Sequence, residues 1–195
     1  MQHFKYHSYE HYLDSQYQSN INRTFFTKLK ADLRAEDIRN IQSVFTGKRC
    51  LCVGCRLDEE VDDFNNNGYD AKGIDILPTN RQIQGDMHRM DLYFKQCSFD
   101  LAYASHALEH SYDPIKVLSL IRKICTEGLY MILPLRNHTD EYEPVLFNVM
   151  RSRATEDLQE LKPGLGDFQV IGSWVRDMPF QPSGAEIAFA IKWLD

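Results

Sequence analysis

Residues 49–54 read Arg-Cys-Leu-Cys-Val-Gly, so that after the arginine every residue up to the glycine is apolar. A strand that is apolar throughout, rather than at alternate positions, is typical of a sheet covered on both faces. Such strands alternate with helices in parallel, doubly wound α/β sheets. This stretch therefore predicts the first strand of a Rossmann-like sheet.

The rest of the chain continues this pattern. Pro114 and Gly128 flank a predicted helix over residues 114–126, the proline in its first turn and the glycine just beyond its end. Residues 168–175 and 186–193 predict an antiparallel hairpin at the sheet edge. The other predicted elements are strands at residues 70–76, 82–87, 99–105 and 129–135, and a helix at residues 152–161. The expected fold class is α/β, with a mostly parallel seven-stranded sheet.

The first 48 residues are polar and aromatic-rich, and they contain no proline or glycine before Gly47. They predict two or three helices, which would form an N-terminal extension ahead of a domain spanning residues 49–195. Tyr9, Tyr12 and Tyr17 recur at helical spacing, a pattern typical of a face that packs on a core. The alternative is a lid over a ligand.

Composition argues against several classes of protein. The chain has 195 residues and a formal net charge of -6, with 43% hydrophobic and 26% charged residues, as expected for one globular domain. A protein that binds nucleic acid through phosphates needs a basic face, so the negative balance argues against that partner. No apolar run approaches the roughly 18 residues that cross a bilayer, and the N-terminus lacks the apolar segment of a secretory signal. We expect a cytoplasmic protein without a membrane partner.

Three of the five cysteines, Cys50, Cys52 and Cys55, lie in or beside the first predicted strand. Cys52 and Cys55 have C-x-x-C spacing, but no second pair completes a zinc site, and a redox pair needs a helix N-terminus. In a buried strand, cysteine behaves as a small hydrophobic residue. We therefore expect reduced structural thiols and no metal.

Ligands of open parallel sheets bind beyond the carboxyl ends of the strands, and these positions are distinctive here. Gly54 follows the first strand, where a missing Cβ lets the backbone approach a ligand. Asp75 ends the second strand, at about the distance from the glycine where an acidic residue binds a ribose diol. Asp86 ends the third strand, and Ser105 and His106 end the fourth.

Taken in order, five segments of the chain resemble the class I S-adenosylmethionine-dependent methyltransferases. They are residues 50–61 (CLCVGCRLDEEV), 73–76 (GIDI), 85–92 (GDMHRMDL), 98–114 (SFDLAYASHALEHSYDP) and 120–134 (LIRKICTEGLYMILP). The fourth segment is especially similar to the type 11 small-molecule group. The resemblance implies a Rossmann-like domain that binds S-adenosylmethionine and methylates a small molecule, such as a metabolite or a sugar-like acceptor.

The resemblance also implies that residues at these strand ends line the cofactor. The implied contacts are Gly54, Cys55 and Arg56 on the methionine part, Asp75 on the ribose hydroxyls, Ile76 on the adenine, Asp86 and Met87 at the adenine edge, and Ser105 and His106 beneath the sulfonium. Either aspartate could instead be a solvated turn residue.

The first loop departs from the family pattern of three glycines at alternate positions. Only Gly54 remains, and Arg56 and Asp58 occupy the other two positions. Because glycine permits positive φ and leaves room for a ligand, we expect this loop to take another path. Arg56 could pair with Glu60 on the next helix or bind the cofactor carboxylate.

Methyl transfer from a sulfonium is an in-line displacement in which positioning supplies much of the acceleration. An oxygen or nitrogen acceptor can need a base, and histidine suits that role at neutral pH. His106 and His110, four residues apart, are the candidates, although both could be structural. Arg136, Tyr142 and Phe147 are candidates for an acceptor pocket.

Three other classes of function stay open. His106, Glu109 and His110 spell H-x-x-E-H, the inverted zinc-protease motif, for which Glu186 could supply a third ligand. The incomplete glycine loop also fits a scaffold or regulatory protein that binds cofactor weakly or not at all. A nicotinamide-dependent oxidoreductase is disfavoured because the first loop lacks G-x-G-x-x-G spacing.

Overall fold

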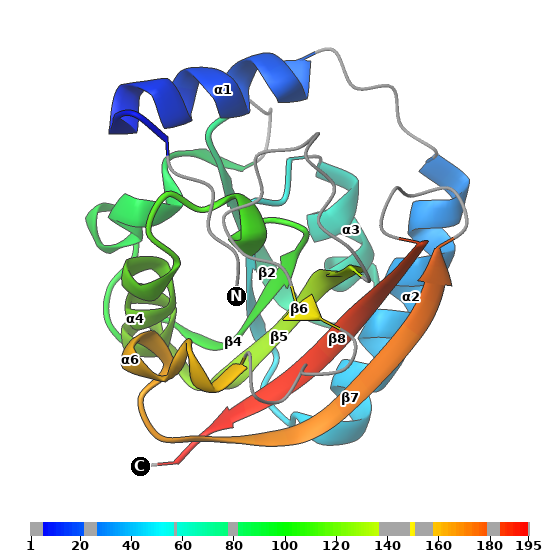
Figure 1. The fold of residues 1–195 in the computed structure, drawn as a ribbon. Coiled ribbons are helices and arrows are strands. Elements are labelled where there is room, and N and C mark those ends of the chain that lie inside the picture. The colour runs from blue at the N-terminus through cyan, green and yellow to red at the C-terminus, as the bar shows by residue number, and fades with distance from the viewer. Residues whose placement is uncertain are drawn as a thin grey trace.

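The computed structural model describes residues 6–21, 27–56, 58–77, 82–136, 149–150, 158–178 and 184–194. Within these ranges, seven strands form one sheet in the order β3-β2-β1-β4-β5-β8-β7, and the short β6 pairs with the end of β5 (Figure 1). Their bounds are β1 Arg49–Val53, β2 Asp70–Asp75, β3 Ile83–Gln84, β4 Phe99–Ser105, β5 Cys125–Arg136, β6 Val149–Met150, β7 Phe168–Met178 and β8 Gly184–Trp193.

The strands β1 to β6 pair in parallel, whereas β8 runs antiparallel to both β5 and β7. The predicted fold class, a mostly parallel Rossmann-like sheet with an antiparallel hairpin at its C-terminal edge, is confirmed. Between β1 and β4 the strand order reverses, and in doubly wound sheets ligands bind beside that reversal.

Helices cover both faces of the sheet. Their bounds are α1 Tyr9–Ile21, α2 Thr27–Val44, α3 Asp58–Asn66, α4 Pro114–Ile124 and α6 Lys162–Leu165, with 3₁₀ helices η1 Met87–Leu92 and η2 Leu108–His110. Strand β1 shows why its residues are apolar throughout: Leu51 and Val53 pack in the cluster that contains α4, and Cys50 and Cys52 pack in the cluster that contains α2 and α3. Figure 1 shows α4 and α6 together on one side, α2 beside β7, and α1 across the top.

Helix α4 begins as its sequence predicts. The Asp113 side chain accepts a hydrogen bond from the Lys116 N–H at 2.9 Å, and Pro114 occupies the first turn. The predicted end at residue 126 is wrong, because the chain leaves the helix at Ile124 and enters β5 directly. Gly128 lies inside that strand, where an added Cβ would be 2.1 Å from the Ile191 carbonyl oxygen. This glycine therefore lets β8 approach β5 and does not end the helix.

Other predicted bounds also change. The third strand, predicted over residues 82–87, contains only Ile83–Gln84, because Asp86 caps the helix η1 that follows. The fifth strand starts at Cys125 and not at residue 129. Of the helix predicted over residues 152–161, residues 152–157 lie outside the described part of the chain.

The N-terminal segment supplies part of the hydrophobic core. Ile38 and Ile41 of α2 are buried in the cluster on one face, and Tyr12 of α1 is buried in the cluster on the other. Tyr17, in the same aromatic stripe, is 40% exposed, so the predicted packing face of α1 ends before that residue. The boundary at residue 48 stays a prediction.

None of the helices in the described ranges is long and apolar enough to cross a bilayer. The five cysteines are free thiols, and all except Cys97 are buried.

Candidate functional site

The carboxyl ends of the first four strands lie along one edge of the sheet. Register places Val53 beside Ile74, and Asp75 beside Gln84. Strands β1 and β4 run in parallel with Cys52 beside Tyr103. The residues that follow these strands therefore gather where the strand order reverses. We call this edge of the sheet, formed by the carboxyl ends of the first four strands, the rim.

The loop after β1 keeps a left-handed backbone although it has lost glycines. Gly54 has φ 67°, and Arg56 has φ 46°, a conformation that costs a non-glycine residue about 1–2 kcal/mol. The Gly54 N–H donates to the Ile74 carbonyl at 2.9 Å. A Cβ on Gly54 would lie 2.5 Å from the Ala107 Cβ, so only glycine lets this loop pack on the chain after β4.

Asp75 is held in place by backbone N–H groups. Its carboxylate accepts from Arg56 N–H at 2.9 Å through Oδ2 and from Leu77 N–H at 2.8 Å through Oδ1. Burial raises the pKa of Asp75, and the two N–H groups together with the charge of Arg56 offset part of that rise. Because each carboxylate oxygen can accept more than one hydrogen bond, the fixed group can still accept from ligand hydroxyls.

The Cys55 thiol is free and buried. It donates to the Ile74 carbonyl at 3.6 Å and contacts Gln82 Oε1. Burial is the main cause that raises the pKa of the Cys55 thiol. Because the thiolate is the reactive form, this environment does not favour a redox role for the C-x-x-C spacing of Cys52 and Cys55.

Asp86 anchors the start of η1. It accepts from His88 N–H at 2.8 Å, and its Oδ1 lies 2.7 Å from His88 Nδ1. His88 Nε2 accepts from the Asp113 N–H at 3.2 Å, so the neutral ring carries its proton on Nδ1 and donates it to Asp86. Ser111 Oγ lies 2.9 Å from the same Nε2. Burial acts to raise the pKa of Asp86, but the His88 hydrogen bonds outweigh it and lower the pKa.

His106 lies between two buried carboxylates. Its φ is 51°, and its ring nitrogens face Glu109 Oε1 at 3.1 Å and Glu186 Oε2 at 2.6 Å. Burial lowers the pKa of His106, but the hydrogen bonds and charges of Glu109 and Glu186 outweigh it and raise the pKa to about 10. At neutral pH the ring is therefore an imidazolium that bridges η2 and β8.

The ion network continues from Glu186 to α2. Arg176 of β7 pairs with Glu186 and, at 2.9 Å, with Asp37 of α2. Asp37 also accepts from the hydroxyls of Tyr103 at 2.9 Å and Tyr130 at 3.2 Å. Burial raises the pKa of Asp37 to about 6, and Arg176 acts against that rise. We call the chain Glu109–His106–Glu186–Arg176–Asp37 the ion network.

His110 lies at the edge of this network. Its Nε2 is 4.0 Å from Glu109 Oε1, and its side chain is partly exposed. Both ring nitrogens of His106 already face carboxylates, and no group of three His, Cys, Asp or Glu side chains in the described ranges is arranged to hold a metal ion. The described geometry therefore does not favour the zinc interpretation of H-x-x-E-H.

The remaining predicted residues differ in how far the structure places them. Ile76 follows β2, Met87 opens η1 and packs partly buried on the core, and Ser105 ends β4. The Arg136 side chain and the residues Tyr142 and Phe147 lie outside the described part of the chain.

Sequence reasoning missed most of the ion network. Glu186 was considered only as a third zinc ligand, yet it is the one charged residue in the apolar stretch 185–191. A charge in such a strand signals a buried partner, because burying an unpaired charge is costly. The sequence around Arg176 and Asp37 gave no comparable indication of a buried ion pair, since both residues lie in segments that mix polar and apolar residues.

A glycine comparison tests the packing of the first loop. Gly54→Ala should lower the free energy of unfolding by about 2–4 kcal/mol, because it adds a contact with Ala107 to the positive-φ strain. Gly68→Ala is the matched control, since Gly68 has φ 84° but open space around its missing Cβ, and should cost about 1–2 kcal/mol. Urea unfolding measures both, and equal losses would show that the Ala107 contact is unimportant.

The fold and the rim define a Rossmann-like α/β protein with a candidate site for a ligand that contains a nucleoside. A family model described as a methyltransferase domain matches residues 9–173, and the chain belongs to this family. No curated protein matches the chain.

Solved structures with this fold are distant in sequence. The 1,6-didemethyltoxoflavin-N1-methyltransferase of Burkholderia thailandensis, crystallised with its substrate and S-adenosylhomocysteine, has a TM-score of 0.73 at 16% identity, covering 97% of this chain and 90% of that one. Magnesium protoporphyrin IX methyltransferase of Synechocystis, crystallised with S-adenosylhomocysteine, has a TM-score of 0.62 at 10% identity, covering 91% and 93%. The cyclase SpnF has a TM-score of 0.61 at 11% identity, covering 98% and 86%. Since one of these proteins is named a cyclase, likeness of fold alone does not define the reaction.

Proposed function

We propose that this protein is an S-adenosylmethionine-dependent methyltransferase that acts on a small molecule. Its membership of the methyltransferase domain family supports the reaction class. The observation that carries the proposal is Asp75, a partly buried carboxylate fixed by two backbone N–H groups beside the Gly54 turn. Both methyltransferases described above were crystallised with S-adenosylhomocysteine, the product form of the same cofactor.

The residues of the rim fit an adenosyl ligand. An ionised Asp75 accepts hydrogen bonds only, which suits the two hydroxyl donors of a ribose. The turn at Gly54, with Cys55 and Arg56, would lie beside the methionine part of the cofactor. Ile76, Asp86 and Met87 would line the adenine, and Ser105 and His106 would lie nearest the sulfonium. When bound, the cofactor supplies an activated methyl group.

The geometry supports a positioning role for His106. An imidazolium that donates from both nitrogens has no lone pair with which to accept a proton. With a pKa of about 10, it holds that state at neutral pH and ties η2 to β8 beside the rim. His110, whose side chain is partly exposed, is the other candidate for a base on the acceptor side.

A small-molecule acceptor is supported by the extent of the structural likeness. The match to the Burkholderia methyltransferase, whose name specifies a small molecule, covers 97% of this chain. The formal net charge of -6 also argues against nucleic acid as the acceptor.

Titration calorimetry of the wild-type protein with S-adenosylhomocysteine and, separately, with NADH tests the proposal. We expect saturable one-site binding of S-adenosylhomocysteine and none of NADH. Binding of NADH alone would overturn the proposal in favour of an oxidoreductase. Transfer of label from methyl-labelled S-adenosylmethionine into a small-molecule extract then distinguishes an enzyme from a cofactor-binding scaffold.

A further inference from the structure

The side chain of Tyr12, on α1, places a polar group in the core without an evident partner. Tyr12 is 0% exposed, and its hydroxyl has no hydrogen-bond partner among the residues that the structure describes. A buried hydroxyl without a partner is destabilising, and such groups in native proteins call for an explanation. A ligand that is absent from the described protein is one such explanation.

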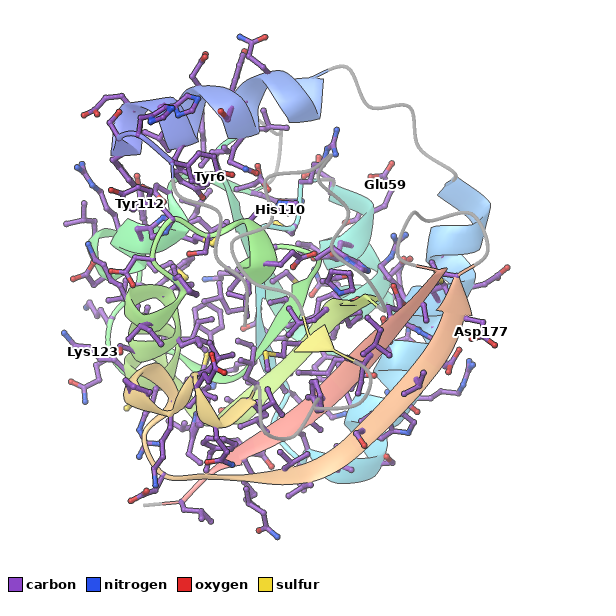
Figure 2. All side chains as sticks on the ribbon, in the orientation of Figure 1. Tyr6, Glu59, His110, Tyr112, Lys123 and Asp177 are labelled. Atoms are coloured by element: carbon purple, nitrogen blue, oxygen red, sulfur yellow. The ribbon has the colours of Figure 1, made fainter. Side chains whose placement is uncertain are left out.

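Aromatic contacts fix where this hydroxyl lies. The Tyr12 ring packs edge-on against Tyr6 at 5.3 Å between ring centroids and against His88 at 5.2 Å. These contacts continue outward to Tyr112, which lies near Tyr6 beneath α1 (Figure 2). The packed rings keep Tyr12 from turning its hydroxyl toward solvent.

The same contacts place Tyr12 at the ends of β2 and β3. His88, on which the ring packs, is bound to Asp86 at the end of β3. Burial is the largest cause that raises the pKa of the Tyr12 hydroxyl, and the charge of Asp75 at the end of β2 adds to it. The hydroxyl is therefore within electrostatic reach of Asp75, although Asp75 itself accepts from Arg56 and Leu77 N–H groups.

We infer that Tyr12 is a cofactor-binding residue whose hydroxyl forms a hydrogen bond with a ribose hydroxyl of the adenosyl ligand. This inference rests on the proposed function. A ribose hydroxyl can both donate and accept, so it satisfies the tyrosine oxygen and can bind the Asp75 carboxylate at the same time. Helix α1 then forms part of the cofactor site in addition to packing on the core.

Tyr12→Phe tests the inference, with Tyr9→Phe as the matched control. Tyr9 lies on the same helix, and its hydroxyl is also buried without a partner among the described residues. Its ring packs on His88 and Tyr112, as the ring of Tyr12 does, but Tyr9 is only partly buried, whereas Tyr12 is 0% exposed. The probes are S-adenosylhomocysteine and 5′-methylthioadenosine, which shares the adenosine but lacks the amino acid. We expect Tyr12→Phe to weaken both about 3- to 10-fold in calorimetry, and Tyr9→Phe to change neither.

The ligand-free proteins supply a second measurement. Because the Tyr12 hydroxyl has no partner among the residues that the ligand-free structure describes, Tyr12→Phe should keep or raise the melting temperature of the free protein. A lower melting temperature would show a structural partner and overturn the inference, as would unchanged affinity or equal losses in both variants. A loss for S-adenosylhomocysteine alone would overturn the ribose assignment. If the wild type binds neither probe, the proposed function itself fails, and this inference fails with it.

Discussion

Asp75→Ala is expected to weaken S-adenosylhomocysteine binding by about 100-fold or more. The carboxylate is fixed by the Arg56 and Leu77 N–H groups, so it meets a ribose without further ordering. Two hydrogen bonds to a charged group contribute roughly 3 kcal/mol or more together, which corresponds to about two orders of magnitude in affinity. Isothermal titration calorimetry measures the change directly.

Two variants serve as controls for Asp75→Ala. Asp75→Asn keeps the shape and one acceptor oxygen, so it should bind with intermediate affinity. Asp70→Ala removes an exposed carboxylate at the opposite end of the same strand and should bind like the wild type. An Asp75→Ala protein that is folded and binds with unchanged affinity would remove the main support for the proposed function.

Arg176→Met is expected to lower the free energy of unfolding by about 3–5 kcal/mol. Arg176 pairs with Asp37 and Glu186, both buried, and its removal leaves two carboxylates in the core without their shared cation. For a chain of this size, a loss of this magnitude lowers the melting temperature by on the order of 10 °C. Urea unfolding and thermal melts measure the two quantities.

The pH dependence of the Arg176→Met protein provides a further check. In the wild type, burial already raises the pKa of Asp37 to about 6, against the opposing effect of Arg176. Without the arginine, the folded-state pKa of Asp37 rises further above its unfolded value, so the folded state binds more protons. The variant should therefore regain stability as the pH falls from 7 toward 4 and lose it as the pH rises.

Lys162→Met is the control for charge removal. Lys162 pairs with Asp167 at 3.1 Å, but both side chains are largely exposed, at 57% and 74%. Such a pair contributes about 1 kcal/mol or less. Comparable losses in the Lys162→Met and Arg176→Met proteins would contradict the view that the ion network stabilises the core.

The elements that the sequence predicted well are those specified by local pattern. A continuous apolar run predicted β1, and shorter apolar segments predicted β2 and β4. Because parallel strands end at one edge of the sheet, these segments also indicated which residues gather at the rim. The predicted end of the helix before Gly128 was wrong, because sequence does not distinguish a glycine that follows a helix from a glycine inside a closely packed strand. Only the contact with Ile191 distinguishes them.

The interactions at the candidate site could be predicted only in part. Asp75 and Gly54 stand at fixed places relative to a strand, so their location follows from pattern. The state of His106 depends on Glu186, 80 residues later in the chain, which no local spacing relates to it. The environment of Tyr12 likewise depends on how α1 lies on His88, which the periodicity of one helix does not specify.

The ion network has a consequence for recombination among proteins with this fold. Its members lie on α2, β7, β8, η2 and the bend after β4, so the network crosses the boundary at residue 48 that the sequence suggests. A chimera that kept residues 49–194 and took its leading helices from a relative without an acid at position 37 would bury Arg176 beside a single carboxylate and leave Tyr103 and Tyr130 without their shared acceptor. An exchanged N-terminal segment must therefore carry an acidic residue at position 37. A junction chosen only to keep the sheet intact would separate Asp37 from Arg176 and give an unstable protein.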